Sequence, residues 1–281
     1  MKKKKKPFKK TLNLFIIFIL LPCIVLLYSH YIGTTGLITN EYKIKNDNFY
    51  GLKIVQISDI HYGKMITKKE LKSLVKKVNL TKPDIVVFTG DLIDKNTTIN
   101  DTERDMIISI LAKIDSNMGS YYIKGDHDNN DTYKFIMDSS GFIDLDNSYD
   151  LIYNNNNEYI MLAGISSHIL DKNIDEKMKN INQFLNENKP NYSILIMHEP
   201  DVIDNINYSK FNLVLAGHSL NGQVKIPFIG GLIKPNYGKK YYDTKYQLKN
   251  TTLYVSGGIG IEDYQFRLFN RPSINLYRLS N

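Results

Sequence analysis

The first 40 residues constrain this chain most, because a lysine cluster is followed directly by an uncharged apolar segment. The first ten residues contain seven lysines and no acidic residue, and residues 11–40 carry no charged side chain. Within them, Leu12–Tyr28 is almost wholly apolar and would span ~26 Å as a helix, near the lower limit for crossing a bilayer. A core helix would be amphipathic and would not follow a lysine cluster. We therefore expect a membrane segment.

The lysines also predict how this segment is oriented, since positive flanks stay in the cytoplasm. Residues 1–11 are predicted to form a basic cytoplasmic tail and residues 12–32 a single-pass transmembrane anchor. A cleaved signal peptide is the nearest alternative, but the bulky residues Tyr28–Tyr31 do not form a cleavage site. We favour an uncleaved anchor in the cell membrane, followed by a linker over 33–50 and an extracytoplasmic domain over 51–281.

The net charge of the chain comes from the tail alone. The formal charge is +7, yet the 29 basic residues after residue 10 balance 29 acidic residues. A neutral body lacks the positive field that binding to a phosphate backbone needs, so we expect no nucleic-acid partner. The only cysteine, Cys23, lies in the apolar segment, so the predicted domain forms no disulfide.

Strand and helix patterns alternate along the predicted domain. Short apolar runs predict strands, and apolar residues at i, i+3, i+4 and i+7 predict helices. Their β-α-β-α-β order favours an α/β fold with helices packed on a sheet. An asparagine run at 154–157 predicts a hairpin tip. The predicted strands cover 52–57, 84–89, 120–124, 159–163, 193–197, 213–216, 253–256 and 274–279, and the predicted helices start at Thr67, include 106–114 and cover 175–188.

Metal-ligand side chains follow the predicted strands. Four of the six histidines come directly after a short apolar run, and three aspartates occupy the same kind of position. The carboxyl ends of strands are where α/β folds gather ligands, so these donors could hold two divalent ions. Mixed carboxylate and imidazole donors suit Mn, Fe or Zn. The residues are Asp59, His61, Asp91, Asp126, His127, His198 and His218.

Each of these pieces alone has an ordinary explanation as a turn or polar loop, but their order and spacing resemble a known family. The resemblance is to the calcineurin-like metallophosphoesterases, in particular to their membrane-anchored bacterial branch, and it covers residues 50–281. It rests on the blocks Ser58-Asp59-Ile60-His61, Gly90-Asp91-Leu92-Ile93-Asp94, Gly125-Asp126-His127-Asp128, His198-Glu199-Pro200 and Gly217-His218-Ser219-Leu220-Asn221-Gly222-Gln223.

The resemblance implies a four-layer αββα sandwich with two divalent metal ions at one edge. It implies that His127 faces the substrate as general acid or charge stabiliser and that Asp128 holds His127. A bridging carboxylate keeps two ions ~3.5–4 Å apart and lets both stabilise an in-line displacement at phosphorus. By motif position, Asp59 and His61 would bind the first metal, Asp91 would bridge, and Asp126, His198 and His218 would bind the second.

Two positions depart from the family pattern. Asp126 stands where the family has asparagine, which keeps an oxygen donor and adds a negative charge. Leu220 stands where the family has a second histidine, and leucine has no donor atom. Asn221 and His168 are the candidate replacement ligands. The alternative for His168 is an ordinary loop residue exposed to solvent.

The resulting hypothesis is a membrane-anchored phosphoesterase that hydrolyses a phosphate monoester or diester. Its partners would be a phosphorylated small molecule or lipid, such as a lipid-linked or cell-envelope phosphate, and the cytoplasmic membrane. The alternative, which rests on Leu220, is a weakened or inactive relative that binds metal and a phosphorylated ligand without efficient turnover.

Overall fold

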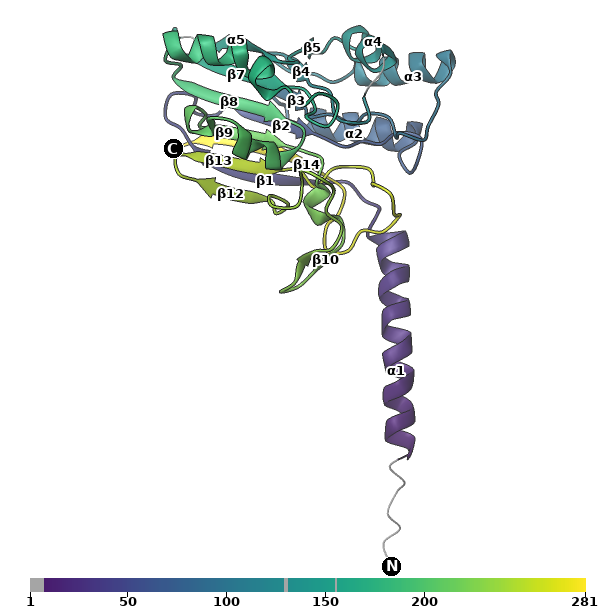
Figure 1. Ribbon diagram of the computed structural model, residues 1–281. Helices are drawn as coiled ribbons and strands as arrows, with labels where there is room; N and C mark the ends of the chain where they lie inside the picture. The colour runs from purple at the N-terminus through teal and green to yellow at the C-terminus, as the bar shows by residue number, and fades with distance from the viewer. Residues whose placement is uncertain (1–7, 129–130, 155) are drawn as a thin grey trace, which may run out of the picture.

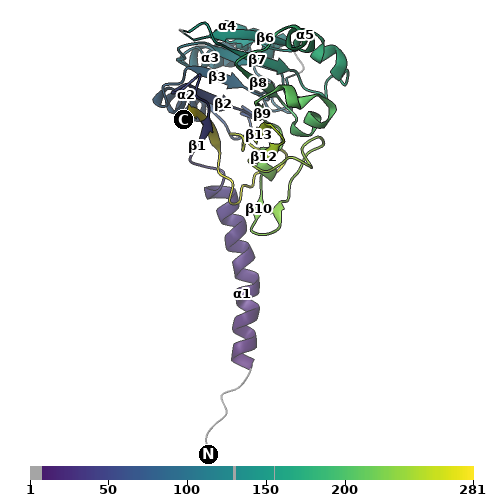
Figure 2. The same ribbon diagram turned by 90° about the vertical axis from the view of Figure 1, so that its left-hand side faces the viewer.

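The computed structural model describes residues 8–128, 131–154 and 156–281. Most of the predicted tail, residues 1–7, lies outside the described residues, as does Asn155 of the predicted hairpin tip. The body is an arrangement of two sheets and flanking helices, from which one long helix projects (Figures 1 and 2).

The projecting helix is α1, Phe8–Leu27, which continues through a π-helical turn over Tyr28–Ile32. The segment Asn13–Ile32 has a mean hydropathy of 2.3, and only 6% of it is buried. Among the described residues it is the one helix long and apolar enough to cross a membrane. Its large apolar side chains from Leu14 to Leu27 are exposed, which agrees with a lipid-facing role.

Two six-stranded sheets form the centre of the body. In the first sheet β2, β3, β4 and β5 run parallel, and in the second β7, β8, β9 and β13 do so. A small hairpin, β10–β11, stands apart from both sheets. The first sheet has the order β1 (Ile38–Lys45), β14 (Ser273–Ser280), β2 (Lys53–Ile57), β3 (Ile85–Phe88), β4 (Ser120–Tyr122), β5 (Ile143–Asp144); the second has β12 (Lys245–Leu248), β13 (Thr251–Val255), β9 (Leu213–Ala216), β8 (Tyr192–Met197), β7 (Tyr159–Ile165), β6 (Ser148–Tyr153); and the hairpin pairs β10 (Lys225–Ile226) with β11 (Gly230–Gly231).

The helices begin where the sequence supplies capping residues. Thr67 and Glu70 form a capping box at the start of α2, and Asn100 and Glu103 form one at the start of α3. Each box satisfies backbone N–H groups that the first helical turn leaves unpaired. The helices of the body are α2 (Lys68–Leu80), α3 (Asp101–Leu111), α4 (Asp131–Ser139) and α5 (Ile174–Glu187), with short 3₁₀ turns at Pro200–Asn205, Tyr208–Lys210 and Leu220–Gly222.

Three separate cores show that the body has four layers. One core joins the first sheet to α2, α3 and α4, through residues such as Leu71 and Val86. A second lies between the two sheets, where Ile54 and Ile85 share a cluster with Ile194. The third joins the second sheet to α5 and the 3₁₀ turns. The predicted α/β class and αββα layering are therefore confirmed, with helices on the two outer faces (Figure 1).

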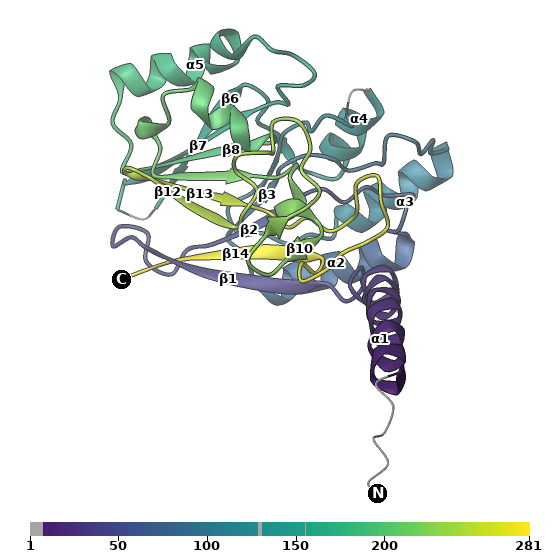
Figure 3. The same cartoon turned by 60° about the horizontal axis from the view of Figure 1, so that its bottom comes forward.

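The segment predicted as a linker over 33–50 is not a free connection. Within it β1 forms the edge of the first sheet, pairing parallel to β14 from Ile38↔Ser273 to Lys45↔Ser280, as Figure 3 shows. The side chains of this strand are exposed or half-buried, and its sequence is polar. It therefore lacks the apolar run by which the other strands were predicted. Its partner is the last strand of the chain, and this long-range pairing decides its structure.

Candidate metal centre

The predicted metal-centre residues lie in loops at the carboxyl ends of parallel strands of both sheets. These ends meet at one edge of the sandwich, so distant parts of the sequence come together there. Four of the residues have left-handed backbones: Asp59 (φ 52°), His61 (47°), Asp91 (63°) and His218 (63°). Such residues cost ~1–3 kcal/mol each and gather at functional sites.

Glycine allows two of these loops to touch. A Cβ added to Gly125 would lie 2.6 Å from the backbone nitrogen of Asp91 and would also clash with its carboxylate. It would lie 2.8 Å from the Cε1 atom of His198. A side chain at position 125 would therefore push the loops after β3 and β4 apart.

Four side chains form a first donor cluster, here called the His198 group: Asp91, Asp126, His198 and His218. Their ligand atoms all lie within 4.8 Å of one another. Nε2 of His198 lies 2.9 Å from Oδ1 of Asp126 and 3.4 Å from Oδ2 of Asp91. Nδ1 of His218 lies 3.2 Å from the same Asp126 oxygen. Two imidazoles and two carboxylates directed at one point are a donor set that suits a divalent ion.

The hydrogen bonds of the two histidines orient them for metal binding. Nδ1 of His198 lies 2.7 Å from the Thr89 carbonyl oxygen, and Nε2 of His218 lies 2.8 Å from that of Asn236. A carbonyl can only accept, so these two nitrogens carry the protons. The other two nitrogens, His198 Nε2 and His218 Nδ1, therefore face the cluster, and a bound metal ion would displace any proton they carry, as in metal sites whose histidines are held by carbonyl partners.

A second cluster, the His61 group, consists of His61, Asp91 and His127. Oδ2 of Asp91 lies 3.7 Å from Nε2 of His61 and 4.0 Å from Nδ1 of His127. Within the described part of the chain, this oxygen, both ring nitrogens of His61 and Nδ1 of His127 are buried without a hydrogen-bond partner. Buried polar atoms are normally satisfied, and a metal ion is one group that would satisfy these. Asp91 belongs to both groups, which is the position of a bridging carboxylate.

The charges of the site also favour a cation. Burial alone would raise the pKa values of Asp91 and Asp126, but the neighbouring histidines hold both below their ordinary range. Burial alone would lower the pKa of His198, yet Asp91 and Asp126 raise it well above its usual value, and Asp126 raises the pKa of His218 to about 9. Burial lowers the pKa of His61 to about 4, which keeps its ring neutral and able to bind metal. Divalent metal ions therefore fit these residues.

Asp59 is placed at the site but outside both donor clusters of the described residues. Its carboxylate is 1% exposed and accepts the backbone N–H of His218, at 3.0 and 3.2 Å. Burial raises the pKa of Asp59 to about 6. In this structure Asp59 connects the loops after β2 and β9.

His127 and Asp128 are adjacent in sequence but make separate contacts. The Asp128 carboxylate accepts backbone N–H bonds from Asp91 (2.7 Å), Leu92 (3.1 Å) and Gly125 (2.9 Å). It thus ties the loops after β3 and β4 together, whereas the resemblance implies that it holds the His127 ring. The ring instead has Nε2 3.7 Å from Oδ2 of Asp126.

Leu220 lies beside the site, and the two candidate replacement ligands do not supply its missing donor. Leu220 is 1% exposed, and a Cβ on Gly258 would clash with it while lying 3.0 Å from Cβ of Asp59. The Asn221 amide faces the carbonyl oxygens of Val255 and Tyr242, at 3.1 and 3.2 Å. The Asn221 side chain is therefore engaged in contacts with backbone atoms.

His168 differs from its predicted state as a solvated loop residue. It is only 7% exposed, its ring packs edge-on against Tyr237 with centroids 5.0 Å apart, and its backbone N–H donates to Glu199. Burial lowers its pKa. His168 belongs to neither of the donor clusters found in the described residues.

Glu262 is a residue of the site that the sequence analysis missed. It follows β13 in the loop that starts at Gly257, and its Oε2 lies 3.9 Å from Nε2 of His61. Its Oε1 lies 3.8 Å from Nε2 of His127. It lies six residues after the strand predicted at 253–256, too far for the rule that selected the other ligands, which requires a donor soon after an apolar run.

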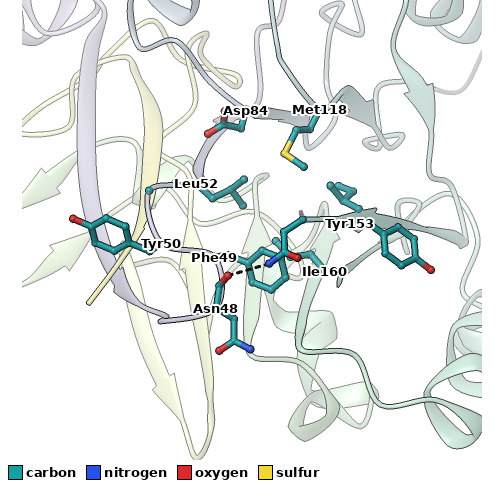
Figure 4. A pocket seen from close by; sticks show the side chains of 11 residues that line it. Asn48, Phe49, Tyr50, Leu52, Asp84, Met118, Tyr153 and Ile160 are labelled. Atoms are coloured by element: carbon teal, nitrogen blue, oxygen red, sulfur yellow. Dashed lines mark hydrogen bonds between the residues drawn. The ribbon is translucent and has the colours of Figure 1, made fainter. Parts of the chain in front are cut away.

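A cavity of about 420 Å³ lies at the opposite ends of the strands and is separate from the metal centre (Figure 4). It is lined by Leu52, Asp84 and Met118, which precede β2, β3 and β4. Its one carboxylate, Asp84, accepts bonds from the Lys53 backbone and the Asn117 amide. This cavity offers no cluster of reactive groups.

Comparison with known proteins agrees with this geometry. A family model described as calcineurin-like phosphoesterase matches residues 52–222. The chain belongs to the calcineurin-like phosphoesterase family. The donor clusters described above lie at one edge of this fold and could bind divalent metal ions.

Among curated relatives, the uncharacterized metallophosphoesterase YkuE of Bacillus subtilis is 32% identical over 263 residues, covering 90% of this chain and 89% of YkuE. A transmembrane protein with metallophosphoesterase domain from Bos taurus is 26% identical, covering 79% of this chain and 52% of the bovine protein. Among solved structures, GAP50, the anchor in the inner membrane complex of Plasmodium, has a TM-score of 0.51 at 10% identity, covering 83% of this chain and 82% of that one, and so shares the fold.

Proposed function

We propose that this chain is a membrane-anchored, metal-dependent phosphoesterase that hydrolyses a phosphate monoester or diester at a two-metal site. The observation that supports the proposal most is Asp91, whose Oδ2 is common to both donor clusters. Two adjacent clusters that share one carboxylate are the donor arrangement a two-metal site needs. The naming of relatives as metallophosphoesterases points to the same reaction class.

The reaction class follows from what each group can do. Bound divalent ions supply Lewis acidity and an activated water in sites of this type. His198 and His218 are held by carbonyl partners so that Nε2 of His198 and Nδ1 of His218 point to the centre, where a metal ion would replace their protons. His127, whose Nε2 lies 3.7 Å from Oδ2 of Asp126, would donate a proton to the departing alkoxide. Asp128 positions the loops that carry Asp91 and Asp126.

The anchor places this chemistry at a membrane. The segment Asn13–Ile32 would cross the bilayer, with the lysine tail in the cytoplasm and the metal centre outside. A substrate in the cell envelope or linked to lipid is then within reach. The substrate class we propose is therefore a phosphorylated lipid or envelope component.

The alternative function is binding of metal and a phosphorylated ligand without efficient turnover. It is supported by Leu220, which is buried at the site and has no donor. One experiment separates the two: metal analysis of the purified full-length protein together with a manganese-supplemented assay on a generic phosphodiester and monoester. Hydrolysis that depends on added metal supports the enzyme, whereas bound metal without hydrolysis supports the alternative.

A further inference from the structure

Glu262 faces the His61 group, to which Leu220 contributes no donor atom. We propose that Glu262 supplies a carboxylate ligand to the ion held by His61, a role that rests on the proposed two-metal function. The family pattern places a histidine at position 220 for this task, and this chain has leucine there. The structure brings a carboxylate in from another loop.

The distances allow a shared ion. Nε2 of His61 lies 3.9 Å from Oε2 of Glu262 and 3.7 Å from Oδ2 of Asp91. Two ligands of one tetrahedral ion, each ~2.1 Å from it, lie ~3.4 Å apart. Both separations exceed that value by only a few tenths of an ångström, which small side-chain rotations can close. A cation at this point would also satisfy the partnerless Nε2 of His61 within the described structure.

The loop that carries Glu262 is held against the motif loops at two points. The Glu262 N–H donates to Oε1 of Gln223 at 3.0 Å, and the Gln223 amide donates in turn to the Tyr264 and Phe266 carbonyls. The Gly260 N–H donates to the Asp59 carbonyl at 2.7 Å. Gln223 is fully buried, so these bonds position the backbone that carries Glu262 before any ligand binds.

The charges around Glu262 also favour a cation beside it. The side chain is 14% exposed and lies near Asp91, and burial together with the neighbouring carboxylates raises its pKa. Lys95 is its one lysine neighbour within ion-pair distance among the described residues, at 3.8 Å, and that lysine is 44% exposed. Because the Lys95 amine is exposed to solvent, it compensates the negative charge of the Glu262 carboxylate only weakly. A divalent ion would do so directly.

The test is the number of manganese ions that the full-length protein retains. Wild-type protein and Glu262→Gln are loaded with Mn²⁺, dialysed, and analysed by mass spectrometry of the metal, with the affinity of the weaker ion measured by titration. We expect two ions in the wild type, and in Glu262→Gln a weaker ion whose affinity falls ~10–100-fold. Asp263→Asn is the matched control, because Asp263 is the exposed neighbouring carboxylate and pairs only with Lys95 in the described contacts.

A rescue variant separates a ligand role from other roles. Leu220→His combined with Glu262→Gln should restore the second ion, since position 220 is where the family pattern has an imidazole ligand. A Glu262→Gln protein that keeps both ions at wild-type affinity overturns the proposal. If that protein differs from the wild type only in the pH profile of hydrolysis, Glu262 acts on the His127 ring instead. A wild-type protein that binds two ions but hydrolyses no ester refutes the phosphoesterase proposal, while the metal counts still decide the role of Glu262.

The β10–β11 hairpin exposes an apolar tip on the side of the body from which α1 leaves. Phe228 is wholly exposed and Ile229 is 67% exposed, with Leu232 and Phe269 also more than half exposed. Figures 1 and 2 are related by a rotation about the vertical axis, and both place this hairpin at the height of the last turns of α1, where the helix meets the body. We infer that this tip inserts into the lipid surface that α1 enters.

The bilayer is the occupant that the surroundings favour. The predicted span ends at Ile32, and the exposed Tyr28 and Tyr31 near that end are residues typical of a membrane interface. Lys225 and Lys234 flank the tip in sequence, Lys225 paired with Asp243 and Lys234 stacked over the Tyr242 ring. The hairpin follows directly from the His218 loop, so an inserted tip brings the metal centre close to the membrane.

Tryptophan fluorescence tests this insertion without disrupting the fold, because the chain contains no tryptophan. Phe228→Trp and the control Phe135→Trp, a 52% exposed position on α4, are reconstituted as full-length protein into phosphatidylcholine–phosphatidylglycerol vesicles. Bromine on the acyl chains should quench the Phe228→Trp emission by roughly half or more and leave Phe135→Trp unchanged. Emission from Phe228→Trp that is unquenched, or quenched no more than the control, overturns the inference.

Discussion

Replacing Asp91 with asparagine separates a bridging metal ligand from a turn residue. Asparagine keeps the shape of the side chain and keeps an oxygen that can accept the backbone N–H of His127, a bond of 3.0 Å to Oδ1 in this structure. It replaces Oδ2 with an NH₂ group, which has no lone pair for a cation. The local turn should survive and the metal ligand should be lost.

The size of the effect follows from the two clusters that share this oxygen. Oδ2 lies 3.4 Å from Nε2 of His198 and 3.7 Å from Nε2 of His61, so one substitution removes a donor from both groups. If each loss weakens metal binding by ~10–100-fold, the combined affinity for two ions falls by ~10²–10⁴-fold. Hydrolysis, which needs both ions, should fall about a hundredfold or more.

Metal content after dialysis and manganese-supplemented hydrolysis of a phosphodiester and a monoester are the two measurements, with circular dichroism to confirm folding. Asp94→Asn is the control, because Asp94 is 3% exposed in the same loop and its carboxylate accepts the Asn96 N–H outside both clusters. An Asp91→Asn protein with wild-type metal content and turnover would refute the bridging role and leave Asp91 as a turn residue.

Three further outcomes are expected. Arg267→Met leaves the Gly257 and Gly260 carbonyls without their buried guanidinium donor, and should lower the free energy of unfolding in urea by about 3 kcal/mol; an unchanged midpoint would contradict this. Burial lowers the pKa of Lys177, so the unfolded chain binds more protons than the folded one as the pH rises towards 10.5, and stability should rise with pH there. That rise should be smaller in Lys177→Met, and equal slopes in urea titrations would argue against it. A tag after Asn281 should be digested by protease in intact spheroplasts, whereas its protection would reverse the proposed topology.

Much of the site was predictable because its residues follow apolar strands in the sequence. His198 and His218 come directly after β8 and β9, and parallel strands bring their carboxyl ends to one edge whatever the details of packing. The helix starts were also local, since the capping box at Thr67 needs only neighbouring residues. The apolar segment Asn13–Ile32 is determined in the same local way.

What the tertiary structure decided depends on contacts between distant residues. The polar segment of β1 is a strand only because β14, more than 200 residues later, offers its backbone groups. The direction of each side chain at the site could not be predicted from the sequence either. Asn221 faces carbonyl oxygens, and Asp128 joins two loops. Glu262 reaches His61 because Gln223 holds its loop in place. Residue type and spacing are local properties of the sequence, whereas which atoms face one another is set by how the two sheets pack.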